Sequence, residues 1–342
     1  MQISPAAFRV LATGFVRSSF PEATRNDRLI STRAYRAFFK IDPLATATLW
    51  EKLEESCENE KSVRDEVQVE WEDIVPENLL WVLYKFKTND CEDVCANLFG
   101  VSRNTYRKYF WALVDFLGML HDETVSLSCF FVITAMTFTN SYYSQCYLDA
   151  RYDSDNGSEC LLSVDGVDFE IKEPGYTNGT EDEYRMWYSH KFSGPGLRYE
   201  IGVCIQTGEI VWVAGPFPPG QFTDLMIFDL GLKQELDVGE MVEVDAGYLG
   251  PGPVRTPDDY NGNLDWKYMK GKVRARHEQI NSCIKQYKIL SEKFRYSMMK
   301  HAKIVNAVIA IVNSEIEEGR GTHQVDYCII RDNQERVYDD GM

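Results

Sequence analysis

The chain carries the run Leu161-Leu162-Ser163-Val164-Asp165-Gly166, a short apolar stretch that ends on a carboxylate. A second run of the same character is Met241-Val242-Glu243-Val244-Asp245-Ala246-Gly247-Tyr248. Short apolar runs bounded by glycine are typical of buried strands. Sites in α/β folds usually form at the carboxyl ends of such strands. The two runs therefore predict a sheet that presents Asp165 and Asp245 at strand ends.

The segment from Cys160 onward has the two-residue period of strands. Strands are predicted at 160–171, 187–192, 198–206, 210–214 and 241–246, and helices at about 222–232, 276–290 and 298–317. Successive strands followed by a helix, a strand and more helices form an α/β layer pattern. The chain has no G-x-G-x-x-G or Walker loop, so we expect an RNase H-like mixed sheet rather than a doubly wound nucleotide fold.

The predicted strand at Asp165 has an irregular apolar pattern. Leu162 and Val164, at even-numbered positions, share one face. After Gly166 the apolar residues occupy odd-numbered positions, which belong to the other face. A β-bulge at Gly166 would explain the change and would present Asp165 into a cleft. The alternative is a hairpin in which Asp165 and Asp168 are turn acids.

Glu278 is a third carboxylate, in the polar and basic helix start Arg274-Ala275-Arg276-His277-Glu278. The net charge of the chain is −17, yet residues 272–303 contain nine Lys and Arg against two acids. A local cationic excess suits a surface that holds a polyanion, although a solvated helix face would also explain it. Two acids at strand ends and one on a later helix can share a pair of Mg²⁺ ions, which stabilise both reacting oxygens of a phosphodiester.

Helical spacing places Asn281, Ser282 and Lys285 on the same side of this helix as Glu278. Apolar residues occupy the opposite side. A carboxylate on the wetter side of an anchored helix can reach a metal ion.

A helix-turn-helix pattern precedes the predicted sheet. Apolar residues recur at three- and four-residue intervals after Pro76, and capping residues at 88–90 predict a second short helix at 91–99. The turn Gly100-Val101-Ser102 leads to a third helix that starts at Arg103. This order is typical of the motif whose second helix enters a DNA major groove.

The third helix of this pattern is basic. It carries Arg103, Arg107 and Lys108 and has no acid before Asp115. These side chains predict contacts with DNA. The alternative is an ordinary helix pair in a protein core.

Composition divides the chain into segments with different expected roles. Residues 1–40 contain seven Lys and Arg, whereas residues 42–93 contain 15 acids against five Lys and Arg. The expected organisation is a basic then acidic N-terminal extension at 1–70, partly disordered or helical; a helix-turn-helix-like region at 71–120; a helical connector at 121–159; an RNase H-like catalytic domain at 160–318; and a polar acidic tail at 319–342.

The composition also limits the cellular setting. No apolar run approaches the roughly 20 residues that span a bilayer, so we expect a soluble protein without a membrane partner. The nine cysteines are scattered, and Cys91 and Cys95 lack a second pair that would complete a zinc site. A reducing compartment is therefore expected. The acid-free N-terminus resembles a transit peptide only weakly, and an amphipathic helix explains it better.

Taken in order, several blocks resemble DDE transposases of the PIF/Harbinger and related insertion-sequence type. The segment 163–169 resembles the D-G-T block with the first metal acid, and 244–248 resembles the D-x-G-Y block with the second. The remaining blocks are 187–192 (y-s-x-K), 220–224 (pG-x-x-x-D), and 276–278 followed by 293–295 (R-x-E, then K-x-F). The resemblance covers about 160 to 310. Val167 replaces the usual Thr, and the segment 175–186 is acidic.

The resemblance implies an enzyme that hydrolyses DNA at transposon ends and transfers the resulting 3′-hydroxyl into target DNA. It implies two ions, Mg²⁺ or Mn²⁺, held by Asp165, Asp245 and Glu278. Asp224 is expected to support these ligands without binding an ion. The residues expected to contact DNA are Arg103, Arg107, Lys108, Lys191, Arg274, Arg276 and Lys285.

The expected partner is double-stranded DNA, both transposon ends and target. A second copy of the chain and a separate DNA-binding subunit are further expected partners, and a eukaryotic host would place the protein in the nucleus. Two other functions stay open at this point. One is a domesticated DNA-binding protein without catalysis, and the other is a metal-dependent nuclease without strand transfer.

Overall fold

The computed structural model describes residues 3–19, 29–59, 69–120, 148–154, 158–172, 181–248, 250, 252–260, 263–320 and 323–327. The chain divides into two compact units. The first comprises Met1–His121 and Cys283–Arg320, and the second comprises Asp122–Ser282 and Gly321–Met342. Most of the predicted connector at 121–159 and most of the predicted acidic tail lie outside the described residues.

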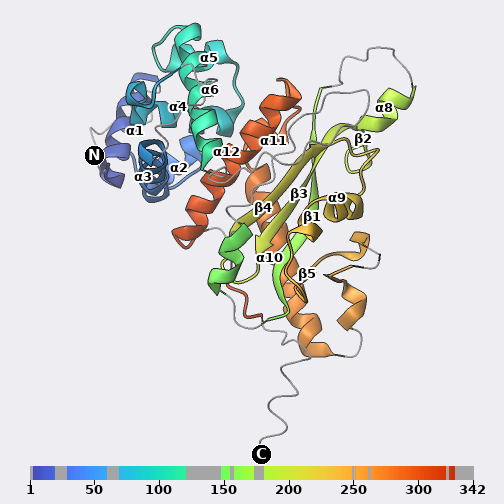
Figure 1. The fold of residues 1–342 in the computed structure, drawn as a ribbon. Coiled ribbons are helices and arrows are strands. Elements are labelled where there is room, and N and C mark those ends of the chain that lie inside the picture. Colours follow the sequence, from blue (N-terminus) through green and yellow to red (C-terminus); the bar gives the residue numbers. More distant parts are fainter. Residues whose placement is uncertain are drawn as a thin grey trace, which may run out of the picture. The chain divides into compact units, whose positions relative to one another are not determined.

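The described part of the first unit is helical. Its elements are α1 (Pro5–Ser19), α2 (Thr32–Phe39), α3 (Pro43–Asn59), η2 (Trp71–Asp73), α4 (Pro76–Thr88), α5 (Glu92–Leu98), α6 (Arg103–Met119), α11 (Lys288–Ser291) and α12 (Met298–Glu317), drawn in Figure 1. Helix α12 is buried on nearly all sides and packs against α3 and α6. A helix that is apolar all round must be enclosed in a core, which explains why 283–320 joins the N-terminal helices.

Local sequence signals set the ends of α4, α5 and α6. Pro76 begins α4, and Asn89 ends it in the left-handed conformation with φ 53°. Ser102 caps α6 by accepting a hydrogen bond from the backbone N–H of Thr105 at 3.1 Å. The three predicted helices of this region are confirmed to within one residue at most of their ends.

The second unit contains the sheet. Its described elements are η3 (Asp149–Ser154), β1 (Cys160–Glu170), α8 (Glu181–Trp187), β2 (Tyr188–Ser189), β3 (Gly194–Cys204), β4 (Ile210–Phe217), α9 (Asp224–Leu230), η4 (Leu232–Gln234), β5 (Met241–Glu243), η5 (Ala246–Tyr248), β6 (Val254–Arg255), η6 (Pro257–Tyr260) and α10 (Leu264–Lys285). Helix α10 begins in this unit and ends at the start of 283–320.

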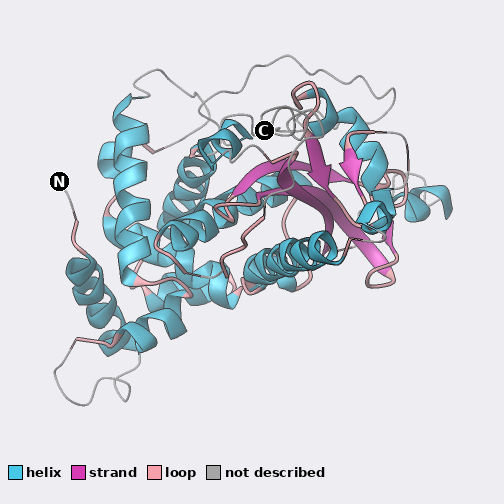
Figure 2. Ribbon diagram, turned by 90° about the horizontal axis from the view of Figure 1, so that it is seen from below, coloured by secondary structure: helices cyan, strands magenta, loops and turns pink. Residues whose placement is uncertain are grey.

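The sheet is mixed, as predicted. The strand order is β2-β3-β1-β5-β6, with β4 paired to β3. Strand β1 is antiparallel to β3 and parallel to β5, while β3 is antiparallel to β4 and β5 is parallel to β6. Figure 2 shows the strands gathered in one twisted sheet. Strand β1, which carries Asp165, is therefore central.

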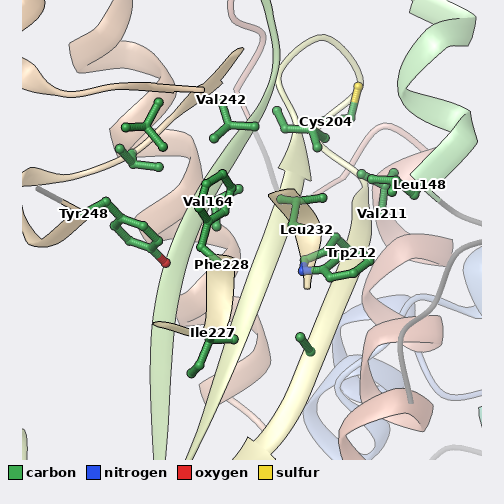
Figure 3. Packing of buried hydrophobic residues seen from close by; sticks show 14 of the residues in the cluster. Leu148, Val164, Cys204, Val211, Trp212, Ile227, Phe228, Leu232, Val242 and Tyr248 are labelled. Atoms are coloured by element: carbon green, nitrogen blue, oxygen red, sulfur yellow. The ribbon is translucent and has the colours of Figure 1, made fainter. Parts of the chain in front are cut away.

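Both faces of β1 are covered. Leu162 and Val164 pack in an apolar cluster with Ile227 and Phe228 of α9, shown in Figure 3. The alternate residue Ser163 faces the other way and contacts α10. Every residue of β1 except Asp165 and Glu170 is buried.

The predicted bulge at Gly166 is wrong. Strand β1 pairs with β3 in unbroken register from Leu162 to Glu170, with Gly166 opposite Glu200. The apolar residues shift from even-numbered to odd-numbered positions because both faces of β1 are buried. A strand buried on both faces does not need apolar residues at every second position. The hairpin alternative is also wrong, since Asp165 lies inside an eleven-residue strand.

Other element limits differ from the predictions. Only Tyr188–Ser189 of the predicted strand 187–192 is a strand, and β5 ends at Glu243. Helix α10 starts at Leu264, twelve residues before the predicted position. Helix α12 has the predicted limits.

A return segment, residues 323–327, brings the chain back to the second unit. Val325 and Tyr327 are buried in a cluster with Cys160, Ile205 and Val273. No helix within the described residues is long and apolar enough to cross a membrane.

Candidate active site

All three predicted carboxylates line one pocket of the second unit. Asp165 comes from β1, Asp245 from the turn after β5, and Glu278 from α10. The pocket has a volume of about 80 Å³, and its other lining residues are Ser163, Val164, Glu243, Val244, Pro257, Lys270, Val273, Arg274 and His277. Residues distant in the sequence thus meet at one place.

Asp165 is half-buried in the wall of the pocket. Its Oδ1 accepts a hydrogen bond from the backbone N–H of Gly166 at 2.8 Å. Its Oδ2 accepts one from Asn281 Nδ2 at 3.1 Å. These two donors fix the orientation of the carboxylate relative to α10.

Asp245 lies two residues beyond β5 and is exposed. Its Oδ1 accepts a hydrogen bond from the backbone N–H of Gly247 at 2.7 Å, which closes an Asx turn. Tyr248 then anchors the turn, because its ring is fully buried and meets the ring of Phe228 edge-on at 6.1 Å. The core therefore holds Asp245 at the pocket mouth.

Glu278 lies on the exposed side of α10. Its side chain is 62% exposed and forms an ion pair with Arg274 at 3.0 Å, one helical turn earlier. Such an exposed i,i+4 pair contributes only about 0.5 kcal/mol. Glu278 can exchange Arg274 for another cation at small cost.

Two buried polar contacts attach α10 to the strands that carry the aspartates. His277 Nδ1 and Ser163 Oγ share a hydrogen bond of 2.8 Å. Lys270 forms an ion pair with Glu243 and donates to the carbonyl of Val244 at 2.9 Å. Burial lowers the pKa of His277 to about 4, so the imidazole is neutral at pH 7. The helix position is thereby fixed against both β1 and β5.

Asp224 lies against β1 from the opposite face of the sheet. It is the first residue of α9, whose cap is Thr223. A Cβ at Gly166 would come within 2.1 Å of Asp224 Oδ1. Only a glycine next to Asp165 leaves room for this carboxylate. Asp224, the predicted supporting residue, is therefore packed against the strand that carries Asp165.

The oxygen donors of the pocket fit a divalent cation, since Mg²⁺ and Mn²⁺ prefer carboxylate ligands. Among the described residues, however, no three His, Cys, Asp or Glu side chains are gathered closely enough to bind one ion. Each carboxylate instead accepts hydrogen bonds from groups of the chain itself, such as Arg274 and Asn281. Binding of an ion by Glu278 would require Arg274 to give way.

The prediction that Arg276 contacts DNA is wrong. Its side chain is 2% exposed, and its guanidinium donates to the carbonyl oxygens of Ile205, Gln206 and His323. These bonds tie α10 to the sheet and to the return segment. Arg274 lies two residues earlier and therefore points to a different side of α10. Its side chain is 66% exposed and lines the pocket.

The other predicted contacts near the pocket differ in position. Lys191 donates to the carbonyl of Gly166, the residue after Asp165, but it is not among the residues that line the pocket. Lys285 is the exposed last residue of α10 and belongs to the first unit. Lys285 is not among the residues that line the pocket.

The basic residues of α6 are exposed, as a DNA-contacting helix requires. Arg103 and Arg107 are about half-exposed and form ion pairs with Glu92, at 3.5 Å and 2.5 Å. Lys108 is exposed and lies over the ring of Tyr109. The second half of α6 is buried, so its basic start alone is accessible.

Several residues that build the pocket were not predicted. They are Ser163, Lys270 and His277, with Glu243 as the partner of Lys270. The helical spacing of 270, 274, 277 and 278 was the available signal, because these positions share one side of α10. It was missed because the predicted helix began at 276.

No curated protein and no solved structure matches the chain. A family model described as DDE superfamily endonuclease matches residues 164–313. The match begins in β1, ends in α12 and includes all three carboxylates. The resemblance to DDE enzymes is thereby confirmed at this level, while the PIF/Harbinger subfamily stays a prediction. Over residues 164–313 this chain is therefore similar to the DDE superfamily endonucleases.

Proposed function

We propose that the chain is a DDE-type transposase that cleaves and joins DNA phosphodiester bonds with two divalent ions, Mg²⁺ or Mn²⁺. The observation that carries this proposal is the single pocket lined by Asp165, Asp245 and Glu278. The strand order, with β1 between an antiparallel and a parallel neighbour, supports an RNase H-like catalytic domain.

The three carboxylates would hold the ions from two sides of the pocket. Asp165 and Asp245 would bind from the sheet, and Glu278 from α10 after leaving Arg274. Bound ions supply an activated water and stabilise charge on the phosphodiester. Arg274, once released, is placed to pair with a DNA phosphate. Ser163 and Lys270 keep α10 in position throughout, through His277 and Val244.

The first unit would bind DNA through α4, α5 and α6, used as a helix-turn-helix. The exposed residues Arg103, Arg107 and Lys108 at the start of α6 support this role. The ion pairs with Glu92 hold the two arginines on the helix surface. Phosphate contacts of this kind give affinity that falls with salt concentration.

The remaining parts of the proposal concern partners and place of action. The DNA partners would be transposon ends and a target duplex, bound by two or more copies of the chain. A separate DNA-binding subunit is a further proposed partner. In a eukaryotic host the protein would act in the nucleus.

A cleavage assay with the purified chain tests the proposal. The substrates are supercoiled plasmid and duplexes made from the DNA that flanks the gene, with Mg²⁺ or Mn²⁺. We expect nicking that is lost with EDTA and reduced at least a hundredfold in Asp245→Asn, because one ligand charge is removed. The matched control is Asp229→Asn, an acid of α9 paired with Lys233 away from the pocket. Equal activity of Asp245→Asn and the parent chain would refute the catalytic role.

One observation favours a second candidate, a DNA-binding protein without catalysis. The structure pairs Glu278 with Arg274, an arrangement that needs no metal ion. This candidate predicts sequence-specific DNA binding that is unaffected by EDTA and no nicking at any Mn²⁺ concentration. Joining of pre-cut ends separates the transposase from a nuclease without strand transfer.

A further inference from the structure

Three buried polar atoms lie on the face of the sheet opposite the pocket. They are Glu200 Oε2, Asp224 Oδ1 and Tyr248 Oη, and none has a hydrogen-bond partner among the described residues. Buried polar groups in folded proteins are nearly always hydrogen-bonded. Three such groups near one another, beside the segments of both predicted metal aspartates, need a physical explanation.

Glu200 is at the centre of this group. It is fully buried in β3, directly opposite Gly166 in the strand register. Its Oε1 accepts a hydrogen bond from Trp212 Nε1 at 2.9 Å. Burial and, to a smaller extent, the neighbouring charge of Asp224 raise the pKa of Glu200 to about 8, against the hydrogen bond from Trp212. The carboxyl is therefore protonated at pH 7 and is a hydrogen-bond donor.

Asp224 connects Glu200 to the strand of Asp165. Its Oδ1 fills the space that a side chain at Gly166 would need. Arg198 Nη1 lies 3.4 Å from the same oxygen, an ion-pair contact. Burial raises the pKa of Asp224, and Arg198 and Lys191 oppose this. A carboxylate with one cation on one side is a suitable acceptor for a neutral carboxyl on the other.

Tyr248 connects Glu200 to the segment of Asp245. It ends the 3-10 turn Ala246–Tyr248, and its backbone N–H bonds to the carbonyl of Asp245 at 3.4 Å. In Figure 3 the hydroxyl end of Tyr248 and the indole nitrogen of Trp212 point toward one another. Trp212 binds Glu200, so the hydroxyl is turned toward the same carboxyl.

We propose that Glu200 is a positioning residue whose carboxyl group hydrogen-bonds with Asp224 and Tyr248 and so fixes the separation of Asp165 and Asp245. Asp224 transmits the constraint to β1 by contact at Gly166. Tyr248 transmits it to the turn that carries Asp245. This role rests on the proposed metal site, because the separation matters only if both aspartates bind the same pair of ions.

The test compares Glu200→Gln with Glu200→Leu. The amide of glutamine keeps a neutral donor of the same shape, whereas leucine fills the space without a donor. Mn²⁺ affinity is measured by calorimetry at pH 7.5, and folding by circular dichroism and thermal unfolding. We expect the Mn²⁺ affinity of Glu200→Gln to stay within threefold of the parent and that of Glu200→Leu to fall at least tenfold.

Further variants separate the possible failures. Tyr248→Phe removes one hydroxyl from the group and should weaken Mn²⁺ binding about threefold to tenfold, which keeps the test decisive if Glu200→Leu does not fold. Asp165→Asn and Asp245→Asn report on the metal site itself. Loss of binding in these two with unchanged affinity in both Glu200→Leu and Tyr248→Phe would overturn the positioning role alone. Unchanged binding in the aspartate variants would instead refute the proposed metal site.

Two other outcomes also contradict the proposal. A purely structural role for Glu200 would lower the unfolding temperature of Glu200→Leu and leave the Mn²⁺ affinity of the folded protein unchanged. A tenfold loss of affinity in Glu200→Gln would show that Glu200 acts as a charge rather than as a neutral donor.

Discussion

Asn281 Nδ2 donates a hydrogen bond of 3.1 Å to Asp165 Oδ2. Asn281 lies one helical turn after Glu278, so one side of α10 supports one predicted metal ligand and supplies another. The relative placement of the two carboxylates therefore depends on α10 as a rigid element.

Replacing Asn281 by alanine tests this dependence. We expect Asn281→Ala to reduce Mg²⁺-dependent nicking about tenfold, because Asp165 loses a donor that orients it, and to lower stability by about 1 kcal/mol. The neighbouring exposed variant Ser282→Ala is the control and should match the parent chain. Rates and urea unfolding curves are measured together. Normal nicking by Asn281→Ala would show that Asp165 is oriented without it.

A methyl group at Gly166 should disturb the contact with Asp224. The new Cβ would lie 2.1 Å from Asp224 Oδ1, so we expect Gly166→Ala to lose about 1–3 kcal/mol of stability and to nick DNA poorly. The control is Gly271→Ala in α10, where a Cβ meets nothing within 4 Å. That substitution should be stabilising by up to about 1 kcal/mol. Equal thermal midpoints for the two variants would contradict the close approach of Asp224.

Arg274 and Arg276 should respond in opposite ways to substitution. Arg276→Ala leaves buried carbonyl oxygens without a donor and should destabilise the second unit by about 3 kcal/mol. Arg274→Ala loses only an exposed ion pair, worth about 0.5 kcal/mol, but should reduce the salt dependence of DNA binding by about one phosphate contact. Chemical unfolding and binding titrations at several salt concentrations measure both. A reversed order of stability would contradict the two placements.

The stability of the second unit should fall in acid because of His277. Burial lowers the pKa of this residue from 6.5 to about 4, so between these values the unfolded chain binds a proton that the folded chain does not. The contribution is lost as pH falls below 6.5, by up to about 1.4 kcal/mol per pH unit. Between pH 7 and pH 5 the parent chain should lose about 2 kcal/mol more than His277→Gln in urea unfolding. Equal losses would mean that His277 is protonated in the folded state.

The start of α6 should control DNA affinity. Lys108→Glu replaces an exposed cation by an anion and should weaken DNA binding at least tenfold at low salt, because each lost phosphate contact releases one counterion fewer. Arg33→Glu, an exposed residue of α2 in the same unit, is the matched control. The measurement is fluorescence anisotropy with a labelled duplex. Equal weakening by both variants would indicate nonspecific electrostatics instead of a helix-turn-helix.

The sequence predicted those features that local signals determine. Helix α12 was placed correctly because its apolar residues are continuous and Ser297 precedes it. Asp165 and Asp245 were identified because each ends an apolar run. The bulge at Gly166 was inferred wrongly, since the pattern of a strand buried on both faces depends on helices that lie elsewhere in the chain.

The features that were missed depend on contacts distant in the sequence. The first turns of α10 look polar because Lys270 is charged, and its burial depends on distant partners: the Glu243 carboxylate and the carbonyl oxygens of Val244 and Arg255. The partnership of Ser163 with His277 joins residues 114 positions apart. Arg276 and Arg274 have the same chemistry, and Arg276 is enclosed because it meets the distant carbonyl oxygens of Ile205, Gln206 and His323.

The return segment also has a consequence for biosynthesis. Tyr327 donates a hydrogen bond to Glu243 at 2.5 Å, and Arg276 is bonded to the carbonyl of His323. The helices of residues 283–320 are translated before these partners exist. A nascent chain that still lacks residue 327 thus leaves Glu243, which lines the pocket, without the hydrogen bond from the Tyr327 hydroxyl.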